Sequence, residues 1–182
     1  MTRALLIIDV QQGLCEGEGA AWDHANVIAR INRVAPHARA SGVPVVFIQH
    51  EDATDLVWGS RAWQLADGLL DEPDDVRVRK TTPDSFLRTD LLALLQARGV
   101  SELIVCGMHT EFCVDTTTRR ALALGYPVTL VADAHTSAGN AALTPQQVIA
   151  HHNTTLTHIS SFGPRVRAIH CDDLLAHWVV AA

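Results

Sequence analysis

Three side chains with complementary chemistry each stand at or beside an apolar segment of the chain. Asp9 ends the first such segment, Lys80 ends a weaker one, and Cys113 lies in the stretch CGMHTEFCV, residues 106–114, next to a helical pattern. When parallel strands form one sheet, ligands bind at the edge where the carboxyl ends of the strands lie. We therefore expect a carboxylate, an ammonium group and a thiol to meet in one crevice.

Such a group of side chains would support nucleophilic catalysis by sulfur. At a helix start, unpaired backbone N–H groups and the helix dipole favour a thiolate, so Cys113 is predicted to be reactive. Asp9 offers a carboxylate that accepts the thiol proton, and Lys80 offers a cation that holds both anions together. Cys106 lies inside the preceding apolar run, and we expect it to be an inert core thiol.

The order of apolar and helical patterns predicts the fold that positions these residues. Short, continuous, β-branched apolar runs are typical of buried strands, and they occur at residues 4–9, 43–49, 102–107 and 126–133, and more weakly at 75–80 and 165–170. Helical patterns occur at residues 24–40, 88–99, 113–125 and 144–160, the last with Thr144 as an N-cap before Pro145. The alternation indicates an α/β fold of three layers, in which helices cover both faces of a mostly parallel, doubly wound, six-stranded sheet.

Length and composition bound the class of protein. The chain has 182 residues, of which 48% are hydrophobic and 19% charged, and this fits one globular domain over residues 1–182. A formal net charge of -6 argues against nucleic acid as a partner. No apolar run is long enough for a bilayer and no signal-peptide pattern is found, so no membrane partner is expected. We expect a cytoplasmic protein with reduced cysteines.

Three stretches resemble the pattern of a known family. They are LLIIDVQ near the N-terminus, RKTTPDSF in the middle, and VCGMHTEFCVDTTTRRALALGYPVTLVADA, in which Gly107, Thr110, Cys113 and Val114 fall where the family pattern places them. The chain resembles the isochorismatase-like cysteine hydrolases over nearly its whole length. That superfamily includes nicotinamidases, N-carbamoylsarcosine amidases and ureidoacrylate amidases.

The resemblance implies roles for individual residues. Asp9, Lys80 and Cys113 would form the catalytic triad. A cis peptide bond would join Met108 to His109, and the backbone N–H groups of His109 and Cys113 would form an oxyanion hole. Since the relatives form dimers and larger closed assemblies, the resemblance also implies a homo-oligomer.

Two subgroups of the family differ from this sequence at informative positions. True isochorismatases lack the nucleophilic cysteine, so the presence of Cys113 favours acyl-transfer chemistry. Nicotinamidases carry a metal site with a D-x-H pattern after the second strand, whereas this chain reads IQHEDATD there, with Gln49 before His50. We therefore expect no metal and no cofactor.

The sequence predicts a hydrolase that cleaves a C–N bond, other than a peptide bond, of a small amide or carbamoyl compound through a thioester on Cys113. Two alternatives remain open: an isochorismatase-type hydrolase of another bond, and a catalytically silent, oligomeric small-molecule binder. Small-molecule sites are mainly apolar, so the candidate pocket residues are Leu14, Trp63, Phe86 and Phe112. For each of them, a core or subunit contact is the alternative.

Overall fold

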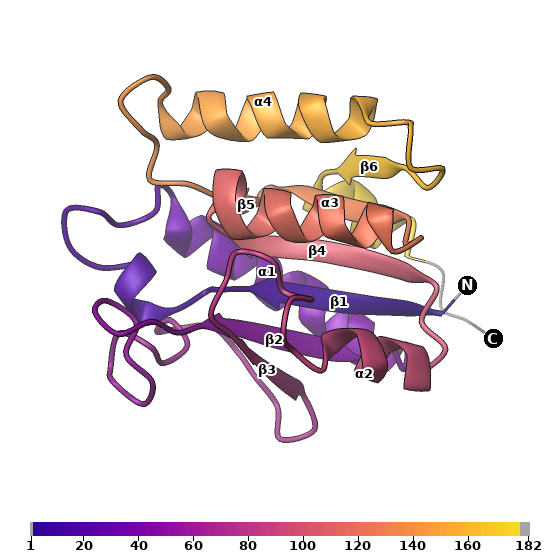
Figure 1. Ribbon diagram of the computed structural model, residues 1–182, viewed down its shortest axis with the longest axis horizontal. Helices are drawn as coiled ribbons and strands as arrows, with labels where there is room; N and C mark the ends of the chain where they lie inside the picture. The colour runs from indigo at the N-terminus through magenta and orange to yellow at the C-terminus, as the bar shows by residue number, and fades with distance from the viewer. Residues whose placement is uncertain (1, 179–182) are drawn as a thin grey trace.

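A parallel sheet forms the centre of the computed structural model, which describes residues 2–178. Six strands lie in the order β3-β2-β1-β4-β5-β6, and every neighbouring pair is parallel (Figure 1). The strands are β1 (Arg3–Ile8), β2 (Val45–His50), β3 (Val76–Lys80), β4 (Glu102–Met108), β5 (Val128–Thr136) and β6 (Val166–Ile169). All six predicted strands are confirmed, and the two with weak apolar patterns, β3 and β6, lie at the edges of the sheet.

The central strands are buried on both faces because their apolar runs are continuous. In β1, Leu5 and Ile7 pack into the core on one face of the sheet. Leu6 and Ile8 pack into a separate core on the other face. Successive side chains of a strand point to opposite faces, so an unbroken apolar run is fully buried only when layers cover both sides.

Helices supply those two layers (Figure 1). One face is covered by α1 (His24–Ala40) and α5 (Cys171–Ala176), and the other by α2 (Leu91–Ala97), α3 (Asp115–Ala123) and α4 (Pro145–His158). The predicted start of α4 is confirmed, because the Thr144 side chain accepts a hydrogen bond from the N–H of Gln147 and Pro145 follows the cap. Helix α5 was not predicted, since six residues are too few to show a helical period.

Gly107 allows β1 and β4 to approach each other closely near their carboxyl ends. It pairs with Ile8 across the two strands and has a φ of +120°. A β-carbon at this position would lie 2.0 Å from the carbonyl oxygen of Ile8, so glycine is the residue that the position accepts. The close approach brings the end of β1, where Asp9 lies, beside the loop that leads to Cys113.

The long connection between β2 and β3, residues 51–75, folds back against the segment that follows β1. Gln11 forms an antiparallel bridge with Leu65, and the N–H of Gln12 donates to the carbonyl of Gln64 at 2.9 Å. Trp58 in this connection is 61% exposed, and the guanidinium of Arg79 lies 4.6 Å from the centre of its ring. The connection therefore packs beside the carboxyl edge of the sheet. The predicted homo-oligomer stays a prediction.

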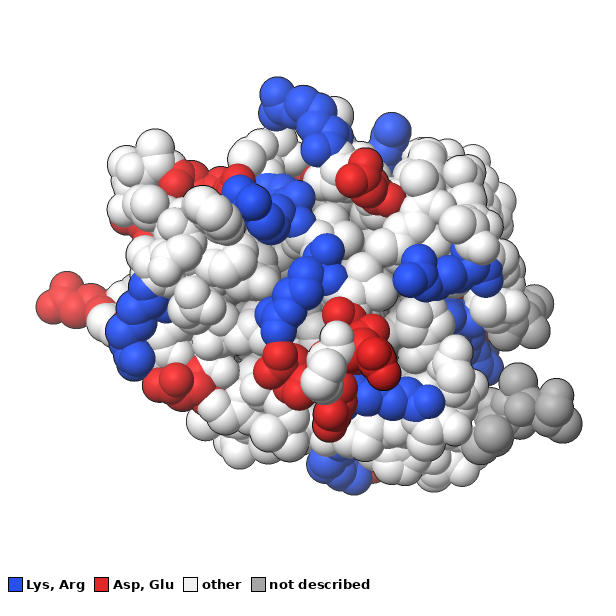
Figure 2. All heavy atoms as spheres, turned by 90° about the horizontal axis from the view of Figure 1, so that it is seen from below, with Lys and Arg blue, Asp and Glu red and all other residues white. Residues whose placement is uncertain are grey.

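The surface near the β3 edge carries charges of both signs. Figure 2, seen from below the view of Figure 1, shows basic and acidic side chains interspersed on this face. Ion pairs around β3 include Arg39–Asp75 at 2.6 Å and Arg79–Glu51 at 2.7 Å. Within residues 2–178, none of the helices combines the length and the hydropathy needed to cross a membrane.

Candidate active site

The ammonium group of Lys80 lies at the centre of a buried polar cluster. Its Nζ is 2.6 Å from Oδ2 of Asp9, 3.2 Å from Sγ of Cys113 and 3.2 Å from Nδ1 of His50. The Lys80 and Asp9 side chains are 0% and 1% exposed. The structure thus brings together the three predicted residues and adds a fourth, His50.

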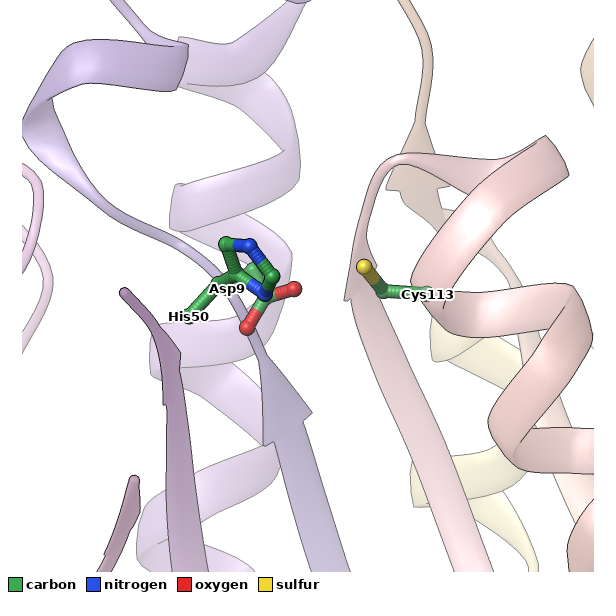
Figure 3. Close-up of side chains that lie close together, drawn as sticks. All are labelled: Asp9, His50 and Cys113. Carbon is green, nitrogen blue, oxygen red and sulfur yellow. The ribbon is translucent and has the colours of Figure 1, made fainter. Parts of the chain in front are cut away.

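The order of the strands explains how these side chains meet. Lys80 ends β3 and lies in register with His50 at the end of β2, which separates β3 from β1. The Lys80 side chain therefore reaches past the end of β2 to Asp9, the first residue after β1. Asp9 has a left-handed φ of +51°, a conformation that Asp tolerates better than most residues. Figure 3 shows Asp9 and His50 on one side of the site and the sulfur of Cys113 on the other.

Cys113 occupies a π-helical turn, η2 (Thr110–Val114), that runs directly into α3. The pKa of its thiol is raised to about 12, mainly by burial and next by the negative charge of Asp9, while Lys80 acts in the opposite direction. The thiol is therefore the resting form of Cys113, which agrees with the predicted need for a carboxylate that accepts its proton. Cys113 retains partial exposure to solvent. Its thiol must lose a proton before it can attack.

Asp9 is arranged to take that proton. Its Oδ2 accepts a hydrogen bond from Lys80, whereas its Oδ1 is buried and has no hydrogen-bond partner within the described part of the chain. A carboxylate oxygen of Asp9 lies within 4.8 Å of the Cys113 sulfur. A buried carboxylate oxygen without a partner is costly, and a proton from the neighbouring thiol would satisfy it.

The other cysteine of the same stretch has a different environment. Cys106 lies in β4, is 1% exposed, and its Sγ is 3.5 Å from the carbonyl oxygen of Leu6. Burial raises the pKa of this thiol as well, and Cys171 adds to the shift, whereas no Asp, Glu, Lys or Arg among residues 2–178 contributes to it. The position agrees with the expected inert core thiol.

The loop between β4 and Cys113 is held by backbone and side-chain hydrogen bonds. The peptide bond between Met108 and His109 is cis. The carbonyl of His109 accepts hydrogen bonds from the N–H groups of Phe112 and Val114, both at 3.2 Å. His109 itself has extended backbone and caps η2, so its N–H and the start of η2 lie on the same short loop.

A buried network fixes the first residue of η2 to the rest of the fold. His135 is 1% exposed, and its Nε2 lies 2.9 Å from Oδ1 of Asn153. Because Asn153 uses its amide nitrogen to donate to the Ala132 carbonyl, its oxygen must accept from His135. Nδ1 of His135 then accepts from the Thr110 hydroxyl at 2.8 Å. The neutral imidazole thus links η2 to β5 and α4.

Protonation of His135 should destabilise the protein in acid. Burial lowers the pKa of His135 from 6.5 to about 4. Between these values the unfolded chain binds more protons, so the stabilisation is present above pH 6.5 and is lost as the pH falls to about 4. For this one group the loss amounts to roughly 3 kcal/mol in the free energy of unfolding. Urea unfolding across this range measures it.

The matched variant for this prediction is His135→Gln, which keeps an acceptor and a donor but does not titrate. Its free energy of unfolding should change less between pH 6.5 and about 4 than that of the parent protein. Equal pH dependence of the two proteins would show that His135 is not the group responsible.

The four candidate pocket residues differ in their surroundings. Phe112, beside Cys113, is 56% exposed, and Trp63 is half-buried with an indole N–H that has no partner within residues 2–178. Leu14 packs against the core beneath α1. Phe86 is buried and stacks on Tyr126 with ring centres 6.4 Å apart. Phe86 therefore fits the core alternative, whereas Phe112 exposes a ring that a ligand can contact.

Sequence reasoning missed two members of this region. The sequence places His50 after the second predicted strand and in an incomplete metal pattern, but it does not indicate that His50 lies in register with Lys80. Glu111 was not considered; its Oε1 accepts from the Ser137 hydroxyl at 2.6 Å, and its Oε2 is buried without a partner in the described residues. Because His50 and Lys80 end two predicted strands, the sequence could have indicated that His50 belongs to the site. No feature of the sequence indicates this for Glu111.

The donor atoms of the site do not favour a metal ion. Ligand atoms of Asp9, His50 and Cys113 lie within 4.8 Å of one another, a spacing that a cation could bridge. However, the Lys80 ammonium already lies within hydrogen-bond distance of all three side chains. A metal ion would have to displace this buried cation, and we derive no chemical step through a metal.

The fold and the side chains at the carboxyl edge define a doubly wound α/β protein with an enzyme-like site. An isochorismatase domain model matches residues 3–160. A solved structure of an isochorismatase family protein superposes with a TM-score of 0.85 at 35% identity, over 92% of this chain and 97% of the other. The chain therefore belongs to the isochorismatase family.

Named relatives indicate the chemistry found among similar proteins. A streptothricin hydrolase of Streptomyces noursei is 41% identical over 73% of this chain and 49% of its own length. A ureidoacrylate amidohydrolase of Methylobacterium radiotolerans is 30% identical over 88% of this chain and 74% of its own length. The chain spans about half the length, 49% and 54%, of the two streptothricin hydrolases that it matches.

Proposed function

We propose that this protein is a cysteine hydrolase that cleaves the C–N bond of a small amide or carbamoyl compound. The observation that carries the proposal is the contact of the Lys80 ammonium with both Asp9 and Cys113 in one buried cluster. The chemistry named for relatives, hydrolysis of streptothricin and of ureidoacrylate, supports a substrate with a C–N bond of this kind.

The first half of the reaction forms a thioester. Oδ1 of Asp9 takes the thiol proton while the Cys113 sulfur attacks the substrate carbonyl carbon. Lys80 stabilises the negative charge on sulfur as it develops. The carbonyl oxygen becomes an oxyanion, which accepts hydrogen bonds from the N–H groups of His109 and Cys113, each contributing about 3 kcal/mol in comparable sites. Asp9 then gives its proton to the nitrogen, the C–N bond breaks, and the amine leaves.

The second half hydrolyses the thioester. Asp9, again a carboxylate, takes a proton from water while the water oxygen attacks the thioester carbon. The C–S bond breaks, the acid leaves, and Asp9 returns the proton to the Cys113 sulfur. Lys80 takes no part in these proton transfers and stabilises Asp9 whenever Asp9 is a carboxylate.

An amide panel tests the proposal. We expect release of ammonia or amine from at least one class among ureido acids, N-carbamoyl compounds, nicotinamide and simple or cyclic amides. Stopped samples of that reaction should show an acyl adduct on Cys113 by intact-mass and peptide analysis. Hydrolysis of an enol ether without an adduct would favour an isochorismatase-type reaction. Binding without turnover of any compound would favour a silent binder.

A further inference from the structure

We propose that His50 is a positioning residue that fixes the Lys80 ammonium by accepting its third hydrogen bond; this inference rests on the proposed function. An ammonium group has three N–H donors and no acceptor. Asp9 and Cys113 accept two of the hydrogen bonds, and Nδ1 of His50, 3.2 Å from Nζ, accepts the third. None of the donors of this buried cation is then left unpaired.

The backbone at His50 is held in place from two directions. The Gln11 side chain accepts a hydrogen bond from the His50 N–H at 2.7 Å and donates one to the His50 carbonyl at 3.0 Å. The same amide nitrogen donates to the Trp63 carbonyl at 2.9 Å. Because Gln11 is fully buried, these hydrogen bonds fix the end of β2 against the segment after β1.

The contact with Lys80 sets the tautomer of the imidazole ring. Nδ1 of His50 lies 3.2 Å from Nζ of Lys80. An ammonium group can only donate, so Nδ1 presents a lone pair and the ring proton lies on Nε2. This is the tautomer in which His50 can accept from an ammonium.

The charges around His50 favour its neutral form. Burial lowers the pKa of His50, the nearby Lys80 lowers it further, and the carboxylates of Asp9 and Asp52 oppose the shift. Cys113, the remaining titratable group of the cluster, is a neutral thiol at rest, because its own pKa is raised to about 12. At neutral pH the ring is therefore an acceptor. If His50 were protonated, an N–H would face the ammonium, and the two cations would repel each other.

Three variants separate positioning from packing. His50→Ala removes the acceptor, so Lys80 loses its third hydrogen bond, and kcat should fall about tenfold while KM changes less. His50→Asn places an amide oxygen near the position of Nδ1, so it should restore most of kcat. It should also remove the acidic inflection that His50 gives the wild-type pH profile below 6.5, because Asn does not titrate. His158→Asn, on an exposed residue of α4, is the matched control and should leave both readouts unchanged.

Two measurements need no turnover and therefore separate this inference from the proposed function. Imidazole 15N spectra should show His50 protonated at Nε2 only, with a pKa below 6.5. Alkylation of Cys113 by iodoacetamide, followed by peptide mass, should be about tenfold slower in His50→Ala and near wild type in His50→Asn, because Lys80 stabilises the thiolate that reacts.

The outcomes are distinct. A proton on Nδ1 of His50, or equal alkylation of Cys113 in all variants, would overturn the positioning role even if the enzyme is active. If the spectra and alkylation rates are as expected but no amide is hydrolysed, the proposed function fails while the assignment of His50 to Lys80 stands.

Discussion

Cys113→Ala should lower turnover of any amide substrate by about four orders of magnitude or more, because it removes the sulfur that forms the thioester. The side chain is only partly buried, so the free energy of unfolding should change by less than about 1 kcal/mol. Turnover at saturating substrate and urea unfolding of the same preparation measure both quantities. The substrate-dependent mass adduct should disappear with the sulfur.

Two variants serve as controls for this prediction. Cys113→Ser keeps a hydroxyl at the same place, but a hydroxyl is harder to deprotonate than a thiol, so turnover should stay close to that of Cys113→Ala. Cys106→Ala removes the other thiol of the same stretch, which lies in the core of β4, and should keep most of the activity. An active Cys113→Ala protein would rule out the sulfur mechanism.

Lys80→Met should cause the second large effect, a loss of both activity and stability. It leaves the Asp9 carboxylate buried without its cation. Asp9→Asn, in turn, leaves the Lys80 ammonium buried without its anion. Removal of one partner from a buried ion pair costs about 3–5 kcal/mol. Each single variant should therefore unfold at much lower urea concentration, and neither should turn over substrate, since Asp9 must cycle as a carboxylate beside a cation.

The double variant Asp9→Asn/Lys80→Met separates the two effects. Because it removes both charges, its free energy of unfolding should be reduced by clearly less than the sum of the two single losses, whereas activity should stay absent. Arg79→Met is the matched control, because Arg79 is the neighbour of Lys80 and pairs with Glu51 at the surface. It should change stability little, since exposed ion pairs contribute little. Additive losses in the double variant would contradict a direct Asp9–Lys80 interaction.

Much of the fold could be predicted because apolar runs and helical patterns are visible in short stretches of the sequence. Continuous apolar runs such as ALLIID can be buried only between two layers, and alternation with helical patterns makes the strands parallel. Parallel strands place their carboxyl ends on one edge, so the proximity of Asp9, Lys80 and Cys113 followed from their places at the ends of elements. The cap at Thr144 is equally local, since it needs only the next three residues.

The tertiary structure decided what depends on register and burial. The sequence places Cys113 beside a helical pattern and Asp9 as its base, but only packing shows that burial and the charge of Asp9 raise the pKa of the Cys113 thiol to about 12. His50 became a partner of Lys80 because two strands pair in that register. Phe86 lies in the core against Tyr126 for a similar reason. The protonation state of Cys113 and the third hydrogen bond of Lys80 depend on atoms from distant segments of the chain. No local sequence pattern therefore predicts them.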